Sequence, residues 1–530
     1  MKEKVIKVFL FFLILCFLSS CASQSTTDGQ DTVIRDAISQ FVLPDAVDDD
    51  IEIVDYIEVQ GKVVYLYWDI DNLSAIDYRG NVTRSDKNQD VTIKITFSYD
   101  LQEVIETYHV TVLAYSELEY LQMEMAHFSL PDIIYDEYQL PNTCQNENIT
   151  LSWASSNPEI IDNVGVKQLP DELTEVKLTL TLQLANKSLS KEFIVMVKSV
   201  QTIDLPKQLN YLHTADYFQD GIMSNLEVSG EYLTMTKDEA TYLSPIYVTE
   251  PFSVLVATWS AIATQDTGSI ELTYRLRVNG VWSDYVTYGE WCLGNKNKSK
   301  SGKTKDGLIK MDEDTISVLN DKKADAFQYQ IYFKKDSDKE PVKLRLVNTT
   351  VNVDVTDTLK PDLPNSVLYD VPKLYQRIVP SIGGSICSPT SMTMMLKYYG
   401  HDFKDMGYQY EHEYMAWLVY DYGDMIFGNW SYNVAVAGAM GEFAYLGLFS
   451  GVYDLMDTLA NIGPVALSVK GNMQGYYNTN GHLLVCKGYK VTDEGIIFIC
   501  NDPNIQNVEV EYTMDTINSV WRNYAYVIVK

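Results

Sequence analysis

Cys387 is the residue of this sequence best placed to act as a nucleophile. It follows the glycines at 383–384, which permit a tight loop, and it directly precedes Ser388 and Pro389, a favourable pair for starting a helix. Apolar residues at helical spacing follow until Gly400, where the predicted helix ends. Because a helix N-terminus stabilises negative charge, this position favours the reactive thiolate over the thiol.

His482 and Asp502 are candidates for a base and the group that orients it. His482 precedes an apolar run, 483–489, that predicts a buried strand, so its ring can enter a cleft while the sheet holds its backbone. Asp502 follows the next predicted strand, 495–500, where a carboxylate can fix the imidazole tautomer and support its positive charge. Asn501 stands beside it and is the alternative for this third position.

Gln376 is a candidate for stabilising an oxyanion. It lies eleven residues before Cys387, at the end of the segment Asp-Val-Pro-Lys-Leu-Tyr-Gln. Its side-chain amide can donate a hydrogen bond to negative charge that develops on a carbonyl oxygen, beside the backbone N–H of Cys387. A thiol, an imidazole, a carboxylate and an amide together predict attack on an amide carbonyl through an acyl-enzyme.

Four short motifs occur in an order that resembles a known family. They are Asp-Val-Pro-x-x-x-Gln at 370–376, Cys-x-Pro-Thr-Ser at 387–391, Gly-His before an apolar strand at 481–489, and Asn-Asp-Pro at 501–503. This order resembles the papain-like cysteine peptidases, and specifically the family that includes the bacteriocin-processing peptidases of double-glycine leaders. The resemblance implies an α+β papain-like domain over 366–530. It also implies Cys387 as nucleophile, His482 as general base and acid, Asp502 as orienting carboxylate and Gln376 in the oxyanion hole.

The resemblance has departures that bear on function. Transporter-fused members of that family carry membrane spans and an ATPase, whereas this domain contains no Gly-x-x-x-x-Gly-Lys-Ser/Thr phosphate loop, so coupling to ATP is not expected. Residues 402–450, rich in Tyr, Trp and Gly, do not align with the family. If they select the substrate, specificity for a double glycine does not carry over. Thiol chemistry of this kind needs no metal and no organic cofactor.

The N-terminus predicts a bacterial lipoprotein signal. Early lysines precede the apolar run 8–17, which is too short to span a bilayer comfortably, and Leu-Ser-Ser-Cys follows at 18–21. This tetrapeptide resembles the lipobox, in which Cys21 receives a diacylglycerol and becomes the mature N-terminus. We therefore expect a signal peptide at 1–20 and an extracytoplasmic body that is lipid-anchored to the bacterial cell membrane at the cell surface. An ordinary cleaved signal peptide is the alternative.

A repeat with an offset of 85 residues predicts two similar β-domains. Apolar residues alternate with polar ones at matching positions, namely Val91, Ile93, Ile95 and Phe97 in one copy and Val176, Leu178, Leu180 and Leu182 in the other. Period-two alternation marks strands with one buried face, and the breaks near Asp100 and Asn186 mark hairpins. We expect immunoglobulin-like β-sandwiches at 39–116 and 117–200, after a linker at 21–38. They resemble the atrophied immunoglobulin-like domains of bacterial surface proteins, and no chemistry is assigned to them.

Residues 203–356 predict a third β-domain. Asn279-Gly280 between two alternating apolar runs is a strong hairpin signal. We expect a jelly-roll-like β-sandwich that binds a ligand or packs on the domain after it. The lysine-rich stretch 296–305 is favoured as a solvated loop over a contact with anionic cell-wall polymer.

Charge and cysteine usage exclude other classes of protein. The 41 basic and 72 acidic side chains give a formal charge of −31, which opposes binding to nucleic-acid phosphates. Apart from Cys16 and Cys21, five cysteines are scattered without regular spacing, so neither a disulfide framework nor a zinc site is expected. Cys486 and Cys500 lie in apolar strands and are expected in the core.

The sequence therefore predicts an extracytoplasmic, lipid-anchored cysteine peptidase that acts on a peptide or protein substrate. The nearest alternative keeps the same triad in a cell-wall peptide amidase or transamidase. The more distant alternative is a non-catalytic surface lipoprotein whose C-terminal domain binds a ligand or serves adhesion.

Overall fold

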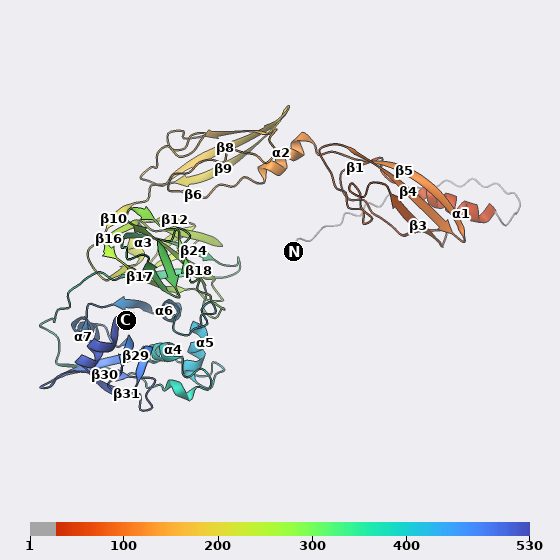
Figure 1. Cartoon of the computed structure of the whole chain (residues 1–530). Helices are drawn as coiled ribbons and strands as arrows, with labels where there is room; N and C mark the ends of the chain where they lie inside the picture. Colours follow the sequence, from red (N-terminus) through yellow and green to blue (C-terminus); the bar gives the residue numbers. More distant parts are fainter. Residues whose placement is uncertain (1–27) are drawn as a thin grey trace. The chain divides into compact units, whose positions relative to one another are not determined.

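The computed structural model describes residues 28–530 (Figure 1). The expected signal peptide at 1–20, the expected lipidation site Cys21 and the first part of the expected linker lie outside the described residues. Two compact units divide the described chain. One holds the residues up to 130 with 140–155 and 178–193, and the other holds 131–139, 156–177 and 194–530. Within the described residues, no helix combines the length and apolar character needed to cross a membrane.

The first sandwich-like domain is a five-stranded sheet with a helix packed on it. Helix α1 (Asp28–Gln40) occupies most of the segment expected as a linker and buries Val33, Ile34 and Ala37 in the same core as the sheet. The sheet has the order β1-β5-β4-β3-β2, with β1 parallel to β5 and the other pairs antiparallel. Its strands are β1 (Ala46–Val47), β2 (Tyr56–Val59), β3 (Lys62–Ile70), β4 (Gln89–Tyr99) and β5 (Gln102–Val112).

The second domain repeats this strand pattern after helix α2 (Glu117–Met125). Ser116 and Glu119 form a capping box at the start of α2, which satisfies two backbone N–H groups there. The sheet has the order β6-β9-β8-β7, and β6 is parallel to β9 as β1 is to β5. Its strands are β6 (Ile133–Ile134), β7 (Thr150–Ser155), β8 (Thr174–Leu184) and β9 (Lys187–Val197).

The offset of the sequence repeat recurs in the structure. The alternating apolar residues of β4 and of β8 are all at most 1% exposed, so the predicted buried faces are the buried ones. The Trp68 indole donates to the carbonyl oxygen of Val54 at 2.9 Å, and the Trp153 indole donates to that of Pro141 at 2.8 Å. Each tryptophan therefore fastens a loop that precedes its strand.

Residues 202–351 form a β-sandwich of two eight-stranded sheets whose facing side chains share one core. The first sheet contains β10 (Thr202–Asp204), β12 (Ile222–Ser224), β15 (Glu239–Leu243), β16 (Ile246–Phe252), β18 (Ser269–Val278), β19 (Val281–Trp282), β20 (Val286–Trp291) and β24 (Ala324–Lys334). The second contains β11 (Asn210–His213), β13 (Leu226–Ser229), β14 (Tyr232–Met235), β17 (Val254–Ile262), β21 (Gly302–Lys303), β22 (Ile309–Asp312), β23 (Thr315–Val318) and β25 (Lys343–Val351). A short helix, α3 (Ala215–Phe218), joins β11 to β12. The hairpin predicted at Asn279-Gly280 connects β18 to β19, and both residues have positive φ, 51° and 80°.

The C-terminal domain is α+β. Its seven-stranded sheet has the order β27-β32-β28-β29-β30-β31, with β26 on the side of β29. The strands are β26 (Ser366–Leu368), β27 (Phe443–Leu448), β28 (Val465–Asn472), β29 (Asn478–Thr492), β30 (Gly495–Asn501), β31 (Glu509–Thr513) and β32 (Trp521–Val529). The helices are α4 (Cys387–Tyr398), α5 (Glu411–Val419), α6 (Trp430–Ala439), α7 (Val452–Asn461) and α8 (Met514–Val520), with a 3₁₀ turn, η1 (Gln376–Ile378).

The apolar run in β29 is buried on both faces of this sheet. Leu483 and Val485 belong to the core that contains α4, whereas Leu484 and Cys486 belong to the core that contains α7. Successive strand residues point to opposite faces, so a strand covered on both sides needs an unbroken apolar sequence. Figure 1 shows α4 beside β29 in this domain.

Strand β27 is an edge strand whose outward backbone groups are satisfied by side chains of the third β-domain. Ser260 both donates to the carbonyl oxygen of Ala444, at 2.7 Å, and accepts from its N–H, at 3.0 Å. At Leu446, Thr258 accepts a hydrogen bond from the backbone N–H and Asn348 donates one to the carbonyl oxygen. At Leu448, the side-chain amide of Asn210 makes both of these hydrogen bonds. An open edge would leave these groups unpaired. The third β-domain and the C-terminal domain therefore form one packed body.

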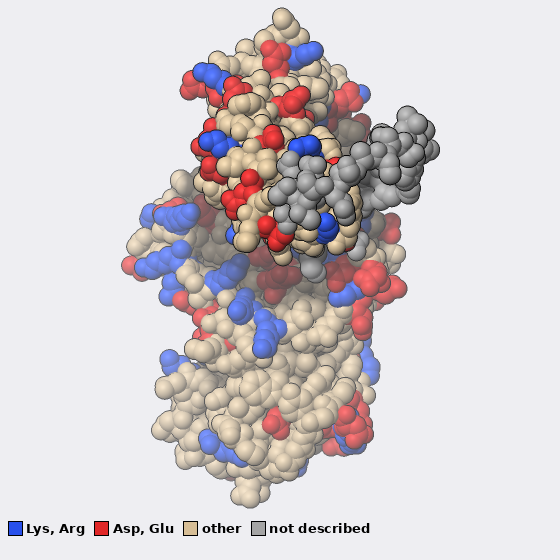
Figure 2. All heavy atoms as spheres, turned by 90° about the vertical axis from the view of Figure 1, so that its right-hand side faces the viewer, with Lys and Arg blue, Asp and Glu red and all other residues tan. Residues whose placement is uncertain are grey.

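The surface carries charges of both signs. On the face shown in Figure 2, acidic and basic side chains are interspersed over the described parts of the chain. On this face the acidic side chains that contribute to the formal charge of −31 are therefore not gathered in a single tract.

Candidate active site

Cys387 and His482 line one cavity of about 810 Å³. Cys387 is the first residue of α4, as its sequence context predicted, and it is partly exposed. His482 lies near the start of β29, whose pairing with β28 and β30 fixes its backbone. A helix terminus and a strand from the middle of the sheet therefore bring the two residues together from positions far apart in the chain.

The environment of Cys387 favours the thiolate. Burial alone would raise the pKa of the thiol, but the positive charge of His482, a hydrogen bond from its ring and the backbone N–H groups of Leu483 and Ser388 outweigh burial and lower it. Backbone donors at a helix start are aligned with the helix dipole, which adds to the same effect.

The ring of His482 is shared between the thiol and a carboxylate. Its Nε2 lies 2.9 Å from Oδ1 of Asp502, which leaves Nδ1 for Cys387. Burial alone would lower the pKa of the imidazole, but the charges of Cys387 and Asp502 and the hydrogen bonds to both raise it. A lowered thiol pKa and a raised imidazole pKa together describe a thiolate–imidazolium pair.

Asp502 is fully buried and has further hydrogen-bond donors besides His482. The hydroxyls of Tyr477 and Tyr512 donate to Oδ2 at 2.6 and 2.7 Å, and the backbone N–H of Asn504 donates to Oδ1 at 2.9 Å. Burial would raise the pKa of this carboxyl, but these hydrogen bonds and the charge of His482 lower it. Sequence reasoning missed both tyrosines, because nothing in the local sequence relates them to Asp502.

Asn501, the alternative to Asp502, points elsewhere. Its side-chain N–H groups donate to the carbonyl oxygens of Val371 and Pro372, at 2.9 and 3.1 Å. This amide therefore ties the segment before Gln376 to the end of β30. Asp502, rather than Asn501, forms the hydrogen bond with the imidazole of His482.

Gln376 is buried close to the loop that precedes Cys387. Its side-chain Nε2 donates to the carbonyl oxygen of Gly383 at 2.9 Å, and its backbone N–H donates to that of Pro503 at 2.9 Å. One Nε2 hydrogen remains after the bond to Gly383. Gln376 is not among the residues that line the cavity, so the structure places it next to the site rather than on its surface.

The other wall of the cavity was not anticipated from the sequence. Residues 312–315, in the turn between β22 and β23 of the third β-domain, contribute Asp312, Glu313 and Asp314. Aromatic side chains from the segment that did not align with the family complete the wall, namely Trp417, Tyr420, Phe427 and Trp430. Arg522, at the start of β32, is the basic residue of the lining besides His482.

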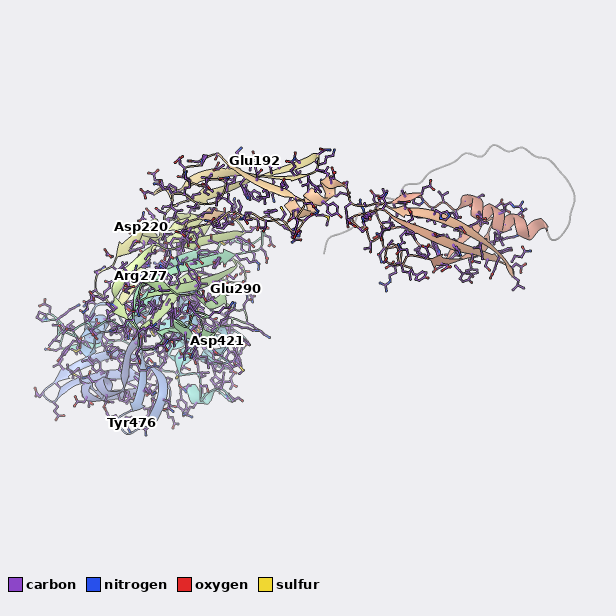
Figure 3. The ribbon with its side chains drawn as sticks, turned by 45° about the horizontal axis from the view of Figure 1, so that its top comes forward. Glu192, Asp220, Arg277, Glu290, Asp421 and Tyr476 are labelled. Atoms are coloured by element: carbon purple, nitrogen blue, oxygen red, sulfur yellow. The ribbon has the colours of Figure 1, made fainter. Side chains whose placement is uncertain are left out.

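The lysine-rich stretch 296–305 supports this wall. Asn297 and Ser299 are buried between exposed lysines, and Ser299 donates its N–H to Asp421 at 3.0 Å. Figure 3 labels Asp421, which also accepts a hydrogen bond from Asn429 at 2.9 Å. The expectation of a solvated loop therefore holds for the lysine side chains but not for the residues between them.

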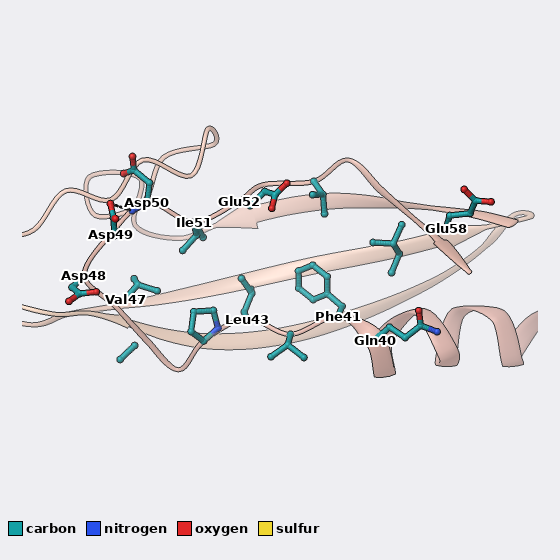
Figure 4. A pocket seen from close by; sticks show the side chains of 15 residues that line it. Gln40, Phe41, Leu43, Val47, Asp48, Asp49, Asp50, Ile51, Glu52 and Glu58 are labelled. Atoms are coloured by element: carbon teal, nitrogen blue, oxygen red, sulfur yellow. Dashed lines mark hydrogen bonds between the residues drawn. The ribbon is translucent and has the colours of Figure 1, made fainter. Parts of the chain in front are cut away.

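A hollow in the first domain lacks comparable chemistry. Figure 4 shows a hollow of about 740 Å³ in the first domain, lined by Phe41, Leu43, Val47 and carboxylates that include Asp49 and Glu52. None of its lining residues offers a thiol, a hydroxyl or an imidazole. In the part of the chain that the structure describes, no group of three or more His, Cys, Asp and Glu side chains is arranged to hold a metal ion. Cys486 and Cys500 are buried in strands, as predicted.

The site and its surroundings define a papain-like thiol active-site arrangement on an α+β domain, and sequence families match both this domain and the third β-domain. Residues 368–529 match the Peptidase_C39 like family, and residues 217–351 match the Peptidase C39 N-terminal domain. The C-terminal domain is therefore a C39-like peptidase domain, and it is preceded by further domains.

Two solved structures are distantly similar to this chain. The CBM51-2 and INT domains of ZmpB from Clostridium perfringens are 8% identical over 40% of this chain and 42% of that one, with a TM-score of 0.13. Zebrafish RET cadherin-like domains 1 to 4 are 11% identical over 55% of this chain and 64% of that one, with a TM-score of 0.13. This chain thus spans less than two thirds of either structure, and TM-scores this low support no argument. No curated protein matches the chain.

Proposed function

We propose that this protein is an extracytoplasmic, lipid-anchored cysteine peptidase that hydrolyses peptide bonds with Cys387, His482 and Asp502. One observation carries the proposal. A single imidazole lies between a thiol at a helix N-terminus and a buried carboxylate, in a cavity open to a substrate. The match to a peptidase family supports the same reaction class and a peptide or protein substrate.

The proposed reaction uses the two protonation states of this pair. The thiolate of Cys387 attacks the amide carbonyl carbon, and the imidazolium of His482 gives its proton to the leaving amine as the C–N bond breaks. The neutral imidazole then takes a proton from water, which attacks the thioester and releases the carboxylic acid together with the thiol. Asp502 keeps the ring oriented and supports its positive charge, and the backbone N–H of Cys387 stabilises the oxyanion. Gln376 adds its remaining Nε2 hydrogen when substrate binding brings the oxyanion within reach of its position next to the cavity.

Attachment to the membrane is the part of the proposal that rests on the sequence alone. Charge, apolar length and Leu-Ser-Ser-Cys at 18–21 support lipidation of Cys21. Labelling of growing bacterial cells with a fatty-acid analogue tests it. The full chain is expected to take up the label and Cys21→Ser to lose it, and equal labelling of both would remove the anchor.

Hydrolysis of a peptide library by the mature chain tests the reaction. Cys387→Ala is expected to lose at least about a thousandfold in rate, whereas Cys144→Ala, which removes a thiol outside the cavity, is the matched control. Unchanged hydrolysis by Cys387→Ala would remove the mechanism. Release of cell-wall peptides without cleavage of the library would favour an amidase or transamidase. Failure to cleave either, with binding retained, would favour a surface binding protein.

A further inference from the structure

The cavity at Cys387 is built by two domains. The C39-like domain supplies the thiol, the imidazole and the aromatic residues, and the β22–β23 turn of the third β-domain supplies the carboxylates. Side chains of the third β-domain form hydrogen bonds with the backbone of β27, so the two domains meet in a fixed arrangement. Part of the surface that a substrate must contact therefore lies outside the C39-like domain.

The turn is held in place by its own residues. Asp314 is buried and accepts hydrogen bonds from the backbone N–H of Trp430, at the start of α6, and from the Thr315 hydroxyl. The backbone N–H of Glu313 donates to the Ser301 hydroxyl at 2.8 Å. Glu313 has a φ of 55°, in the left-handed region that residues with a Cβ seldom adopt. Surrounding contacts must maintain such a conformation. The conformation in turn fixes the direction in which the Glu313 side chain leaves the backbone.

Glu313 differs from its neighbours in having no partner for its carboxylate. Asp312 is paired with Lys310 at 2.5 Å, and Asp314 has the donors just described. Among the residues that the structure describes, none makes a hydrogen bond or an ion pair with the Glu313 carboxylate. Burial is the largest cause that raises the pKa of Glu313. The charges of Asp424, Asp421 and Asp312 raise this pKa further and that of Arg522 lowers it, so the carboxylates around the turn are the source of a negative potential there.

A negative potential beside apolar surface matches a particular kind of side chain. Trp417 and Met425, which line the same cavity, leave 38% and 74% of their surfaces exposed. Lys and Arg have apolar stems that pack on such surface and a cationic end that a carboxylate attracts. Arg522 opposes this preference, but its guanidinium lies 5.0 Å over the Trp430 ring.

We propose that the third β-domain forms the specificity wall of the active site and that Glu313 binds a cationic side chain, Lys or Arg, of the substrate peptide. This inference rests on the proposed peptidase function and names its substrate class. It assigns to the β-domain a part in selecting the substrate as well as in packing against the catalytic domain.

Dipeptidyl chloromethyl ketones test the proposal without requiring turnover. The Cys387 thiolate forms a thioether to the reagent and displaces chloride, and mass spectrometry follows the rate. Reagents carry Lys, norleucine or Glu at either position. We expect the Lys reagent to react about fivefold faster than the norleucine reagent at one of the two positions, as an ion pair of about 1 kcal/mol would give. The Glu reagent should be slowest.

Variants of the full mature chain then separate the contributions of Glu313 and Arg522 to this preference. Glu313→Gln should remove the preference for Lys over norleucine, and Glu313→Lys should invert the order of Lys and Glu. Arg522→Gln should enlarge the preference for Lys. Asp336→Asn is the matched control, because Asp336 belongs to the same β-domain and lines a different hollow. An unchanged preference in Glu313→Gln overturns the proposal, as does a wild-type preference for Glu that Arg522→Gln abolishes.

Iodoacetamide, which carries no peptide, distinguishes this inference from the proposed function. Equal iodoacetamide rates in wild type and Glu313→Gln show that the variant has folded with an intact thiolate. Slow reaction with iodoacetamide in wild type would remove the proposed function. If the preference for Lys were still present in wild type and still lost in Glu313→Gln, the cation-binding site would remain supported without the proposed peptidase function.

Discussion

The imidazole of His482 and the carboxylate of Asp502 are joined by a hydrogen bond of 2.9 Å from Nε2 to Oδ1, and neither residue is more than 5% exposed. The bond orients the ring so that its other nitrogen serves Cys387. It also places a negative charge where water cannot screen it, which supports the positive charge that the ring acquires. The reactivity of Cys387 should therefore depend on a residue that it does not touch.

The pH dependence of Cys387 alkylation should reveal the thiolate–imidazolium pair. The pKa of the thiol is lowered and that of His482 is raised, so the pair exists between these two values. Reaction with iodoacetamide should remain fast well below the pKa of about 8.5 of a free thiol and should fall as pH drops through the lowered pKa of Cys387. His482→Ala should restore a profile that rises only near pH 8.5. Identical profiles in wild type and variant would show an ordinary thiol.

Asp502→Asn should uncouple the pair, whereas Asn501→Ala should not. Without the carboxylate the imidazolium loses its main support, the pKa of His482 falls, and we expect a loss of about 10²–10⁴ in peptide hydrolysis. Asn501→Ala removes hydrogen bonds to Val371 and Pro372, so it should reduce stability while leaving the alkylation profile in place. The reverse outcome would make Asn501 the orienting residue.

Tyr477 and Tyr512 should act through Asp502 as positioning residues. Burial and the charge of Asp502 raise the pKa of both phenols, so they remain protonated donors at neutral pH. Removing a donor with Tyr477→Phe or Tyr512→Phe raises the pKa of Asp502. The acid limb of the alkylation profile should then move to higher pH, with a loss of about tenfold or less in rate. Tyr489→Phe, which removes a hydroxyl bonded to Pro364, should leave that limb unmoved.

The triad could be predicted because each member has a local signal. Cys387 begins a helix, His482 opens an apolar strand and Asp502 ends one, and these signals depend only on neighbouring residues. Glu313, Trp430 and Tyr512 carry no such signal. They reach the site through contacts between distant segments, which a single sequence does not encode in its local pattern.

The fold likewise divides into features that have a local sequence signal and features that have none. Alternation in β4 and β8 predicted their buried faces, because one strand suffices to define the period. The sequence predicts a linker at 21–38, whereas residues 28–40 form helix α1, in which polar residues surround a few apolar ones. Val33, Ile34 and Ala37 stand at helical spacing, and burial against a sheet elsewhere in the chain makes that weak pattern a helix.

Asp314 should make stability fall as pH rises. Burial raises its pKa from 3.8 to about 7, although hydrogen bonds from Trp430 and Thr315 oppose the change. Because the folded state holds this proton more tightly than the unfolded state, the contribution is complete below about pH 4 and is lost as pH rises towards 7. The loss amounts to at most about 4 kcal/mol. Urea unfolding at pH 5 and 8 measures it, and Asp314→Asn should reduce the difference. An undiminished difference would assign it to other groups.

Gly438→Ala should weaken the packing between the two domains that build the cavity. Gly438 lies in α6, where alanine is intrinsically about 1 kcal/mol more favourable than glycine, so propensity alone predicts stabilisation. A Cβ at this position, however, would lie 2.4 Å from the Cα of Ser260 in β17. Backbone cannot move aside as a flexible side chain can, and overpacking of this kind costs about 1–3 kcal/mol. The clash should therefore outweigh propensity.

We expect Gly438→Ala to lower the urea midpoint and to reduce alkylation by the dipeptidyl reagents more than alkylation by iodoacetamide, because α6 begins at the cavity residue Trp430. Gly428→Ala is the control for stability, since its Cβ would meet nothing within 4 Å. A higher midpoint for Gly438→Ala would mean that α6 and β17 have room to separate. The third β-domain would then be a less rigid wall than its contacts along β27 indicate.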